Sequence, residues 1–308
     1  MNPLVIVGPT ASGKSALALN IAIRTGGEIV SIDSRQVYRG LDIGTAKPSQ
    51  HDRELVPHHL LDIIGPERKT DARWFSRIAS EAVRDVLSRS KLPILTGGSG
   101  LYLKAILEGL FSIDLDEDMR SAFAKSIIET STCELLKELR KVDKESAERI
   151  HPNDRYRLTR ALEVYSLTGL SLSDHFARQK ESEGGGLDMI CLKTGIDITR
   201  KELRKRIAER TLLMFDDGWP EEVRSLLSQG ADPEWYGMKT LGYPEVISYV
   251  NGESSRQETI DKIVLKTSQY AKRQMTWFRS DKDIRWINGD VRKQSELVFK
   301  MLDTKEFN

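Results

Sequence analysis

The sequence predicts an α/β protein with a mostly parallel sheet core, helices on both faces and an inserted all-helical subdomain. Two observations carry this prediction: strand-like and helix-like segments alternate through the first hundred residues, and a charged, helical pattern follows from about residue 116. Such alternation is typical of parallel sheets with right-handed crossovers. Ligands bind beyond the carboxyl ends of the strands in sheets of this kind.

The octapeptide at residues 8–15 fits the phosphate-binding pattern G-x-x-x-x-G-K-[ST] at every position. It follows an apolar run at 4–7, expected as a buried strand, and precedes residues 16–23, expected as a helix. Backbone N–H groups and the helix N-terminus would hold an anion. Lys14 would bring a charge to the phosphate and Ser15 a hydroxyl to Mg²⁺. The core is therefore expected to be P-loop NTPase-like, with a phosphate site made of Gly8, Pro9, Thr10, Ala11, Ser12, Gly13, Lys14 and Ser15.

Further elements follow in order. Strands are expected at 28–33, 57–63 and 92–95, and an amphipathic helix at 71–90. A glycine-rich loop at 97–100 opens a helix that runs to residue 107. A returning strand is expected at 188–192, and helices from 198 to about 278. We therefore expect three segments: 1–115 as the first part of the core, 116–187 as the helical insertion, and 188–308 as the core continuation with a basic helical tail.

Bulk composition bounds the function classes. A net charge of +1, from 47 basic and 46 acidic residues, leaves nucleic-acid binding undecided. Cys133 and Cys191 lie far apart without clustered partners, so we expect neither a disulfide scaffold nor structural zinc, and a cytoplasmic protein. A core strand by residue 4 leaves no room for a signal peptide. No apolar stretch is long enough to span a bilayer, so no membrane partner is expected.

Asp33 follows the strand after the P-loop helix and should point into the phosphate crevice. From spacing, this carboxylate could be a general base, a Mg²⁺ ligand or a helix cap. Ser34, Arg35 and Gln36 add donors and acceptors that could reach a base or a phosphate, or simply form a solvated loop. His58 and His59 lack ligand-spaced partners and are expected to be structural.

Basic segments recur along the chain. Arg157 and Arg160 share one helix face. Residues 193–210 and 256–282 each hold seven Lys and Arg against three Asp and Glu. A near-neutral chain with three such segments is consistent with a polyanionic ligand, although a solvated basic face is the alternative. Trp277 and Phe278 are more simply read as core residues. Asp216 and Asp217 are expected at a helix end.

Together these segments resemble the tRNA dimethylallyltransferase family, also called tRNA isopentenyltransferases. The resemblance runs in family order over nearly the whole chain, with small departures at Ser99, Tyr156 and Pro244. The chain lacks the zinc-finger tail of eukaryotic members, which is expected of a bacterial-type member. The matching strings are GPTASGKS at 8–15, DSRQVYRGLDIGTAKP at 33–48, PHHLLDI at 57–63, PILTGGSGLYLKA at 93–105, RIHPNDRYRLTRALEVYSLTG at 149–169, GW-EEV at 218–223, LGYPEV at 241–246 and QYAKRQMTWFRS at 269–280.

The resemblance implies transfer of a dimethylallyl group from dimethylallyl diphosphate to N6 of adenosine 37 beside the tRNA anticodon. Asp33 would take the N6 proton, and Thr10 would contact the oxygen that bridges C1 of the dimethylallyl group and the diphosphate. Lys14, Arg210 and Mg²⁺ held through Ser15 would stabilise the leaving diphosphate. The target base must flip out of the anticodon stem-loop. Contacts to tRNA are expected from Asp33, Ser34, Arg35, Gln36, Ser99, Tyr156, Arg157, Arg160, Lys272, Arg273, Gln274 and Trp277. A monomer is the default expectation.

Three other functions share parts of this pattern. An adenylate isopentenyltransferase would modify a free nucleotide and would need neither basic segments nor a large insertion. A P-loop small-molecule kinase would leave the segment 33–48 without a role. A non-catalytic RNA-binding protein would not need Lys14, Ser15 and Asp33 intact.

Overall fold

The chain forms two compact units. The computed structural model describes residues 2–109, 117–181, 186, 187 and 189–304 of the 308. One unit comprises Met1–Leu107 with Met189–Asn308, and the other Glu108–Asp188. The second unit thus begins earlier than the expected start of the insertion at 116. Each unit is described by itself below.

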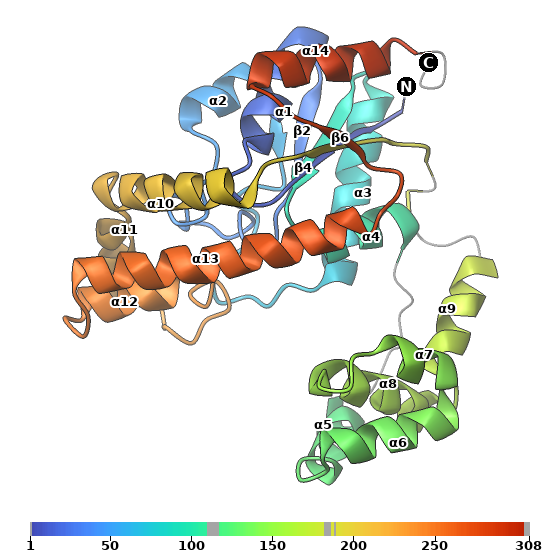
Figure 1. The fold of residues 1–308 in the computed structure, drawn as a ribbon. Coiled ribbons are helices and arrows are strands. Elements are labelled where there is room, and N and C mark those ends of the chain that lie inside the picture. The colour runs from blue at the N-terminus through green and yellow to red at the C-terminus, as the bar shows by residue number, and fades with distance from the viewer. Residues whose placement is uncertain (1, 110–116, 182–185, 188, 305–308) are drawn as a thin grey trace. The chain divides into compact units, whose positions relative to one another are not determined.

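A six-stranded parallel sheet, in the order β3-β2-β4-β1-β5-β6, forms the centre of the first unit (Figure 1). Leu4 on β1 lies opposite Ile94 on β4 and Leu192 on β5. All residues of β1, β2 and β4 are buried, as in parallel sheets covered on both faces. The strands are β1 (Leu4–Val7), β2 (Glu28–Ile32), β3 (His58–His59), β4 (Pro93–Gly97), β5 (Leu192–Ile196) and β6 (Arg285–Ile287).

Helices cover both faces of this sheet. On one face, Leu17 and Ile21 of α1 (Lys14–Thr25) and Val298 of α14 (Val291–Leu302) join a core with strand residues such as Leu4 and Ile6. The crossover from β3 to β4, which contains α3 (Ala72–Ser88), runs across the sheet in the opposite direction to that from β1 to β2, so right-handedness puts α3 on the other face. The remaining helices of this unit are α2 (Gln50–Leu55), α4 (Gly100–Glu108), α10 (Arg200–Asp216), α11 (Trp219–Ser228), α12 (Tyr243–Val250) and α13 (Arg256–Arg279).

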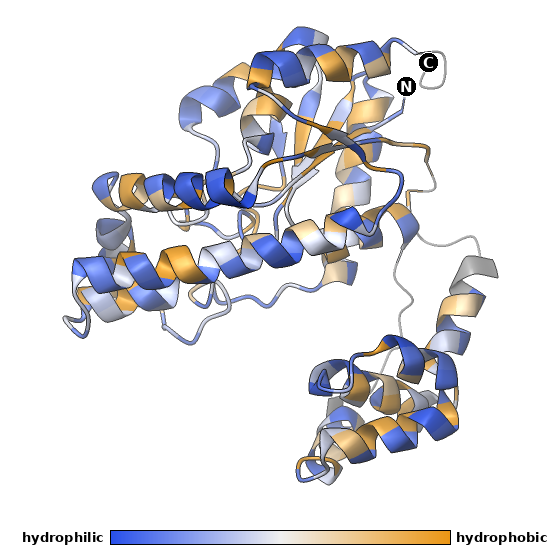
Figure 2. Cartoon of the chain, in the orientation of Figure 1, coloured by the Kyte–Doolittle hydropathy of each residue, from blue (hydrophilic) through white to orange (hydrophobic). Residues whose placement is uncertain are grey.

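Hydrophobic and hydrophilic residues alternate around the outer helices, as Figure 2 shows for α13 and α14. This pattern lets one side of each helix pack while the other faces water. Among the described residues, no helix combines the length and the apolar character that crossing a bilayer requires.

Several elements differ from expectation. The expected returning strand is present and pairs with β1, but its bounds of 188–192 were wrong: β5 begins at Leu192, and Asp188 lies outside the described residues. The strand expected at 57–63 shrinks to two residues, because Leu60 and Asp62 adopt positive φ and turn the chain. Helices α2 and α14 and strand β6 were not foreseen. β6 has only three residues and no alternation long enough to detect.

Helices are the only regular elements among the described residues of the second unit. Its small core joins buried residues of three helices, among them Leu135, Leu139, Leu158 and Ala161. Asp143 accepts hydrogen bonds from the backbone N–H groups of Ser146 and Ser173, and so links the helix that contains Ser146 to the helix that contains Ser173. The helices are α5 (Glu117–Ser126), α6 (Thr132–Val142), α7 (Lys144–Arg149), α8 (Arg155–Thr168) and α9 (Leu172–Glu181).

Candidate active site

The P-loop connects the end of β1 to the start of α1. Ala11 and Gly13 adopt positive φ, at 63° and 99°, which turns successive N–H groups toward one side. Helix α1 begins at Lys14 with no side-chain hydrogen bond at its N-cap. Its first backbone N–H groups and the positive end of its dipole are therefore suited to an anion.

Two helices from the far end of the chain hold this loop. The Thr10 N–H donates to Oε1 of Gln274 on α13 at 2.9 Å. Nη2 of Arg210 on α10 donates to Oγ1 of Thr10 at 2.6 Å. Arg206, one turn earlier on α10, donates to the carbonyl oxygen of Ser12 at 3.3 Å. The expected catalytic residues Thr10 and Arg210 are therefore in direct contact.

A cavity of about 70 Å³ lies at the mouth of the P-loop. Asp33 follows β2, and its Oδ1 accepts the Arg35 N–H at 2.9 Å, which orients the carboxylate. All four residues expected to be catalytic, together with Ser15, line this one cavity: Thr10, Lys14, Asp33 and Arg210. The strand ends thus converge as the sequence predicts.

Burial perturbs the cations of the cavity. It lowers the pKa of the Lys14 ammonium to about 8, with a smaller lowering from Arg210, while Asp33 acts in the opposite direction. Burial also lowers the pKa of the Arg210 guanidinium, again opposed by Asp33. Two cations with reduced solvation beside one carboxylate leave positive charge available for an anionic ligand.

Three polar groups of the cavity were missed by sequence reasoning. Ser31 and Thr96 occupy the next-to-last positions of β2 and β4, and His58 lies on β3. Thr96 is 8% exposed, and its Oγ1 has no hydrogen-bond partner among the described residues. Polar residues at the carboxyl ends of predicted buried strands were the available signal.

Tyr270 of α13 was also missed. Burial raises the pKa of its phenol, as does the negative charge of Asp33, while the side chains of Ser99 and Gln274 act in the opposite direction. The expected contact residue Ser99 therefore lies near Tyr270 of α13. Helical spacing within the segment 269–280 could have pointed to Tyr270, since it precedes Gln274 by one turn.

Two side chains expected to contact tRNA, Gln36 and Gln274, instead form hydrogen bonds within the protein. The Gln36 amide donates to the carbonyl oxygens of Thr45 and Ala46, at 3.2 and 3.1 Å. The Gln274 amide donates to the Gly98 carbonyl oxygen at 2.9 Å, while its own oxygen accepts from the P-loop. Both side chains brace loops around the cavity.

Other expected contacts are at the surface of the first unit. Arg35, Lys272, Arg273 and Trp277 are exposed, and Ser34 is half-buried. The Trp277 ring lies against Gly100, where a Cβ would come within 2.1 Å of the indole. A glycine at this position is needed for the close approach of α13.

The expected contacts of the second unit surround the start of α8. Tyr156 is 80% exposed, and Arg157 pairs with Asp154 at 2.8 Å. Arg160 pairs with Glu163. Arg155, the third arginine of the segment, instead donates to backbone carbonyl oxygens of residues 127, 128 and 130. Arg157 is therefore an exposed surface group, Arg160 is half-buried beside the buried Glu163, and Arg155 is structural.

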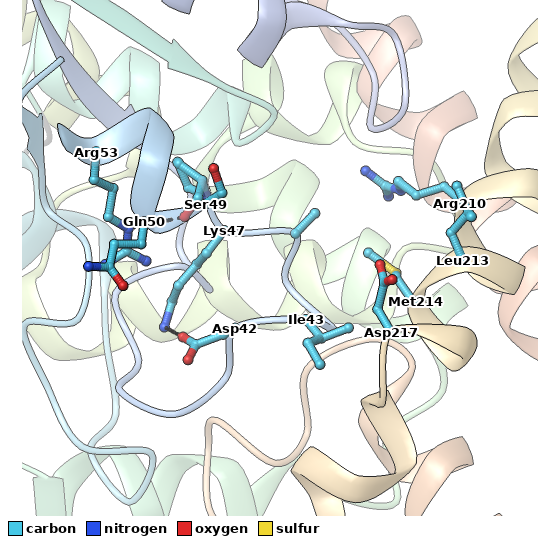
Figure 3. Close-up of a pocket in the computed structure, with 12 residues that line it drawn as sticks. Asp42, Ile43, Lys47, Ser49, Gln50, Arg53, Arg210, Leu213, Met214 and Asp217 are labelled. Carbon is cyan, nitrogen blue, oxygen red and sulfur yellow. Dashed lines mark hydrogen bonds and ion pairs between the residues drawn. The ribbon is translucent and has the colours of Figure 1, made fainter. Parts of the chain in front are cut away.

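A second, larger cavity of about 700 Å³ adjoins the first, with which it shares Ala46, Pro48 and Arg210. Figure 3 shows its two walls: one from the segment 42–53, and one from Arg210, Leu213, Met214 and Asp217 of α10. Asp217 is the C-cap of α10, as expected for a helix end.

The fold and the cradle define a P-loop α/β protein in which a loop suited to an anion and a carboxylate line the same cavity. The family model described as IPP transferase matches residues 36–281. The chain is 46% identical over 287 residues to tRNA dimethylallyltransferase 2 of Geotalea uraniireducens, covering 92% of this chain and 91% of the relative. It is 44% identical over 285 residues to tRNA dimethylallyltransferase of Geobacter sulfurreducens, with the same coverages.

A solved structure agrees. The tRNA isopentenylpyrophosphate transferase of Staphylococcus epidermidis matches with a TM-score of 0.70 and 34% identity, over 98% of this chain and 99% of that one. The chain belongs to the tRNA dimethylallyltransferase family, and it is a transferase.

Proposed function

We propose that this protein transfers the dimethylallyl group of dimethylallyl diphosphate to N6 of adenosine 37, next to the tRNA anticodon. The products are N6-isopentenyladenosine and diphosphate. The observation that carries the proposal is the convergence of Thr10, Lys14, Asp33 and Arg210 on one cavity at the P-loop. Membership of the family supports this choice of donor and acceptor.

The reaction forms a bond between N6 and C1 of the donor while the bond between C1 and the diphosphate oxygen breaks. The exocyclic amine of adenine is a weak nucleophile, so its proton must leave as the new bond forms. The Asp33 carboxylate accepts that proton, and the Arg35 N–H fixes its orientation. The bonding electrons of C1 leave with the diphosphate.

Negative charge grows on the diphosphate as the bond breaks. Lys14, Arg210 and the P-loop N–H groups are already in place before the reaction, so they stabilise this charge without reorganising. The Thr10 hydroxyl, which accepts from Arg210, can donate its own proton to the bridging oxygen. Burial of both cations strengthens these interactions relative to water.

The oxygen groups of the cavity fit Mg²⁺, which we propose as the cofactor. Magnesium prefers oxygen ligands and keeps several waters. Ser15 and Asp33 line the cavity, and the Thr96 hydroxyl there has no partner among the described residues. Ser15 would hold the ion directly. A bound ion would neutralise part of the diphosphate charge. No group of three or more His, Cys, Asp or Glu side chains suited to a metal occurs in the described part of the chain.

The acceptor is proposed to be the anticodon stem-loop with its target base flipped out. Exposed cations and rings on both units suit a single-stranded loop, since bases stack on aromatic side chains and phosphates attract arginine and lysine. We assign this contact to Tyr156, Arg157 and Arg160 on the helical unit and to Lys272, Arg273 and Trp277 on α13.

The deciding experiment offers labelled dimethylallyl diphosphate, Mg²⁺, unmodified anticodon stem-loop RNA and AMP in one reaction. Label at adenosine 37 supports the proposal, whereas label only in AMP indicates an adenylate isopentenyltransferase. Hydrolysis or transfer of ATP phosphate with no prenyl transfer would indicate a kinase. Asp33→Asn is the control, because it keeps the size of the side chain and removes the base.

A further inference from the structure

Residues 42–48, here called the divider loop, form a wall shared by the two cavities. Thr45, Ala46 and Pro48 line the small cavity at the P-loop. Asp42, Ile43 and Lys47, again with Ala46 and Pro48, line the large cavity (Figure 3). The position of this loop therefore sets the shape of both cavities.

One carboxylate holds the first half of the divider loop. The N–H groups of Asp42 and Ile43 donate to Oε2 of Glu222 at 2.8 and 2.7 Å. The Gly44 N–H and the Tyr243 hydroxyl approach Oε1, at 3.5 and 2.7 Å. Four donors from two distant segments thus converge on a single side chain of α11. Hydrogen bonds to a charged acceptor are the stronger kind.

Tight packing supports this anchor. A Cβ at Gly44 would lie 2.3 Å from Nε1 of Trp219 and 2.6 Å from the Tyr243 ring, so only glycine fits there. Trp219 and Tyr243 are fully buried. Burial and the Glu222 charge raise the pKa of the Tyr243 phenol well above its ordinary value, which keeps the hydroxyl protonated and donating.

The second half of the loop has separate anchors. Gln36 donates to the Thr45 and Ala46 carbonyl oxygens and accepts from the Ser31 hydroxyl at 2.8 Å. Lys47 donates to the Tyr38 carbonyl oxygen and to Asp42, both at 2.6 Å. Loss of Glu222 would therefore release the segment around Ile43 without freeing the whole loop.

We propose that Glu222 is a positioning residue for the donor substrate. The P-loop binds the diphosphate, and the Glu222-anchored loop presents Ile43, Ala46 and Pro48 to the hydrocarbon of an allylic diphosphate. The inference rests on the proposed function, because it takes its donor from there. It gives the GW-EEV and LGYPEV segments, which contain Glu222 and Tyr243, a role at the site although neither residue lines either cavity.

The test measures binding of dimethylallyl diphosphate and of inorganic diphosphate by calorimetry, with Mg²⁺ and without RNA. In Glu222→Gln, the amide N–H₂ would face N–H and O–H donors. We expect the affinity for dimethylallyl diphosphate to fall about tenfold, roughly the loss of one hydrogen bond to a charged group. The affinity for inorganic diphosphate should change less than about twofold. Tyr243→Phe removes one of the four hydrogen-bond donors to Glu222 and should weaken binding of dimethylallyl diphosphate about threefold.

Glu221→Gln is the matched control. It makes the same charge change one residue earlier on α11, where Glu221 is exposed and pairs with Arg224, and it should leave both affinities unchanged. In transfer assays, Glu222→Gln should raise KM for the donor and leave KM for the RNA unchanged. Glu222→Asp, which keeps the charge, should recover part of the donor affinity.

Equal loss of affinity for both ligands, or a lower melting temperature with both affinities intact, would overturn the inference and make Glu222 purely structural. If Glu222→Gln does not fold, the test uses Tyr243→Phe and compares its loss of affinity for dimethylallyl diphosphate with its loss of affinity for inorganic diphosphate. A wild-type protein that prefers the donor over inorganic diphosphate but transfers nothing to RNA would contradict the proposed function and leave the role of Glu222 standing.

Discussion

The two units of this protein use charged side chains differently. In the first, Lys14 and Arg210 are drawn out of water around a cavity, and burial lowers the pKa of both. In the second, Arg157 is exposed and pairs with Asp154, the N-cap of α8, whereas Arg160 is half-buried and pairs with the buried Glu163. A surface pair such as Arg157–Asp154 contributes little to stability and is screened by salt.

From this difference we expect the buried charges of the first unit to serve catalysis and the exposed charges of the second unit to serve RNA binding. Buried charges in fixed positions stabilise developing charge strongly. Exposed arginines can exchange a carboxylate partner for an RNA phosphate at small cost. We therefore expect substitutions in the cavity to cause large losses of turnover, and substitutions on the helical unit to cause small, salt-dependent losses of RNA affinity.

The largest effect is expected for Asp33→Ala. Removing the base should lower the rate of transfer by about 10²–10⁴-fold while leaving tRNA affinity nearly intact. Single-turnover transfer and filter binding measure the two quantities. Matched losses in both would mean that Asp33 is structural, and the contrast between the units would fail.

Glu28 tests the buried charges of the first unit through stability. This side chain is 1% exposed and pairs with Arg89, His59 and Lys91. These partners, Arg89 foremost, lower the pKa of its carboxyl from 4.5 to about 2. The folded protein then binds fewer protons, so the stabilisation is full above pH 4.5 and is lost as the pH falls through 2.

Glu28→Gln should therefore lower the free energy of unfolding at neutral pH by up to about 3 kcal/mol and flatten its decline between pH 4.5 and 2. Denaturant unfolding at several pH values measures this. The control is Glu138→Gln in the second unit, which removes an exposed pair with Lys141 and should cost under about 0.5 kcal/mol. Similar costs for both variants would contradict the comparison.

Lys14 tests the cavity through ligand binding. Its pKa of about 8 means that the ammonium is charged below pH 8 and loses its proton above it. A diphosphate stabilises the charged form, so affinity for inorganic diphosphate should weaken as the pH rises through 8, by up to about tenfold per unit. In Lys14→Arg the charge persists, and this part of the pH dependence should disappear. Calorimetry at pH values from 7 to 9 measures the affinity of both proteins. If the affinity of the wild type and of Lys14→Arg depends on pH in the same way, Lys14 is not the group that titrates.

Arg157→Ala should give the smallest effect. We expect a few-fold weaker binding of tRNA and a salt slope reduced by about 1. Asp154→Asn is the informative partner: asparagine still caps α8, but the carboxylate that pairs with Arg157 is gone. RNA binding should then tighten. An unchanged salt slope in Arg157→Ala would remove this arginine from the interface.

Local features were predictable from sequence because their determinants are contiguous. The P-loop needs only adjacent backbone geometry, and Asp33 needs only the end of the next strand. The amphipathic helix expected at 71–90 appears as α3, since its apolar residues repeat at helical spacing. The three-residue strand β6 was not predictable, because its pairing with β5 rather than its own pattern makes it a strand.

The sequence by itself determined a phosphate cradle, a carboxylate at the neighbouring strand end and a charge-rich helical insertion. Only the tertiary structure decided which side chains support them. Gln274 meets Thr10 across 264 positions of the chain, and Glu222 meets Asp42 across 180. Hydrogen bonds between such distant residues leave no periodic or local trace in a sequence. They exist because the packed sheet and helices bring buried donors and acceptors together, where each must find a partner.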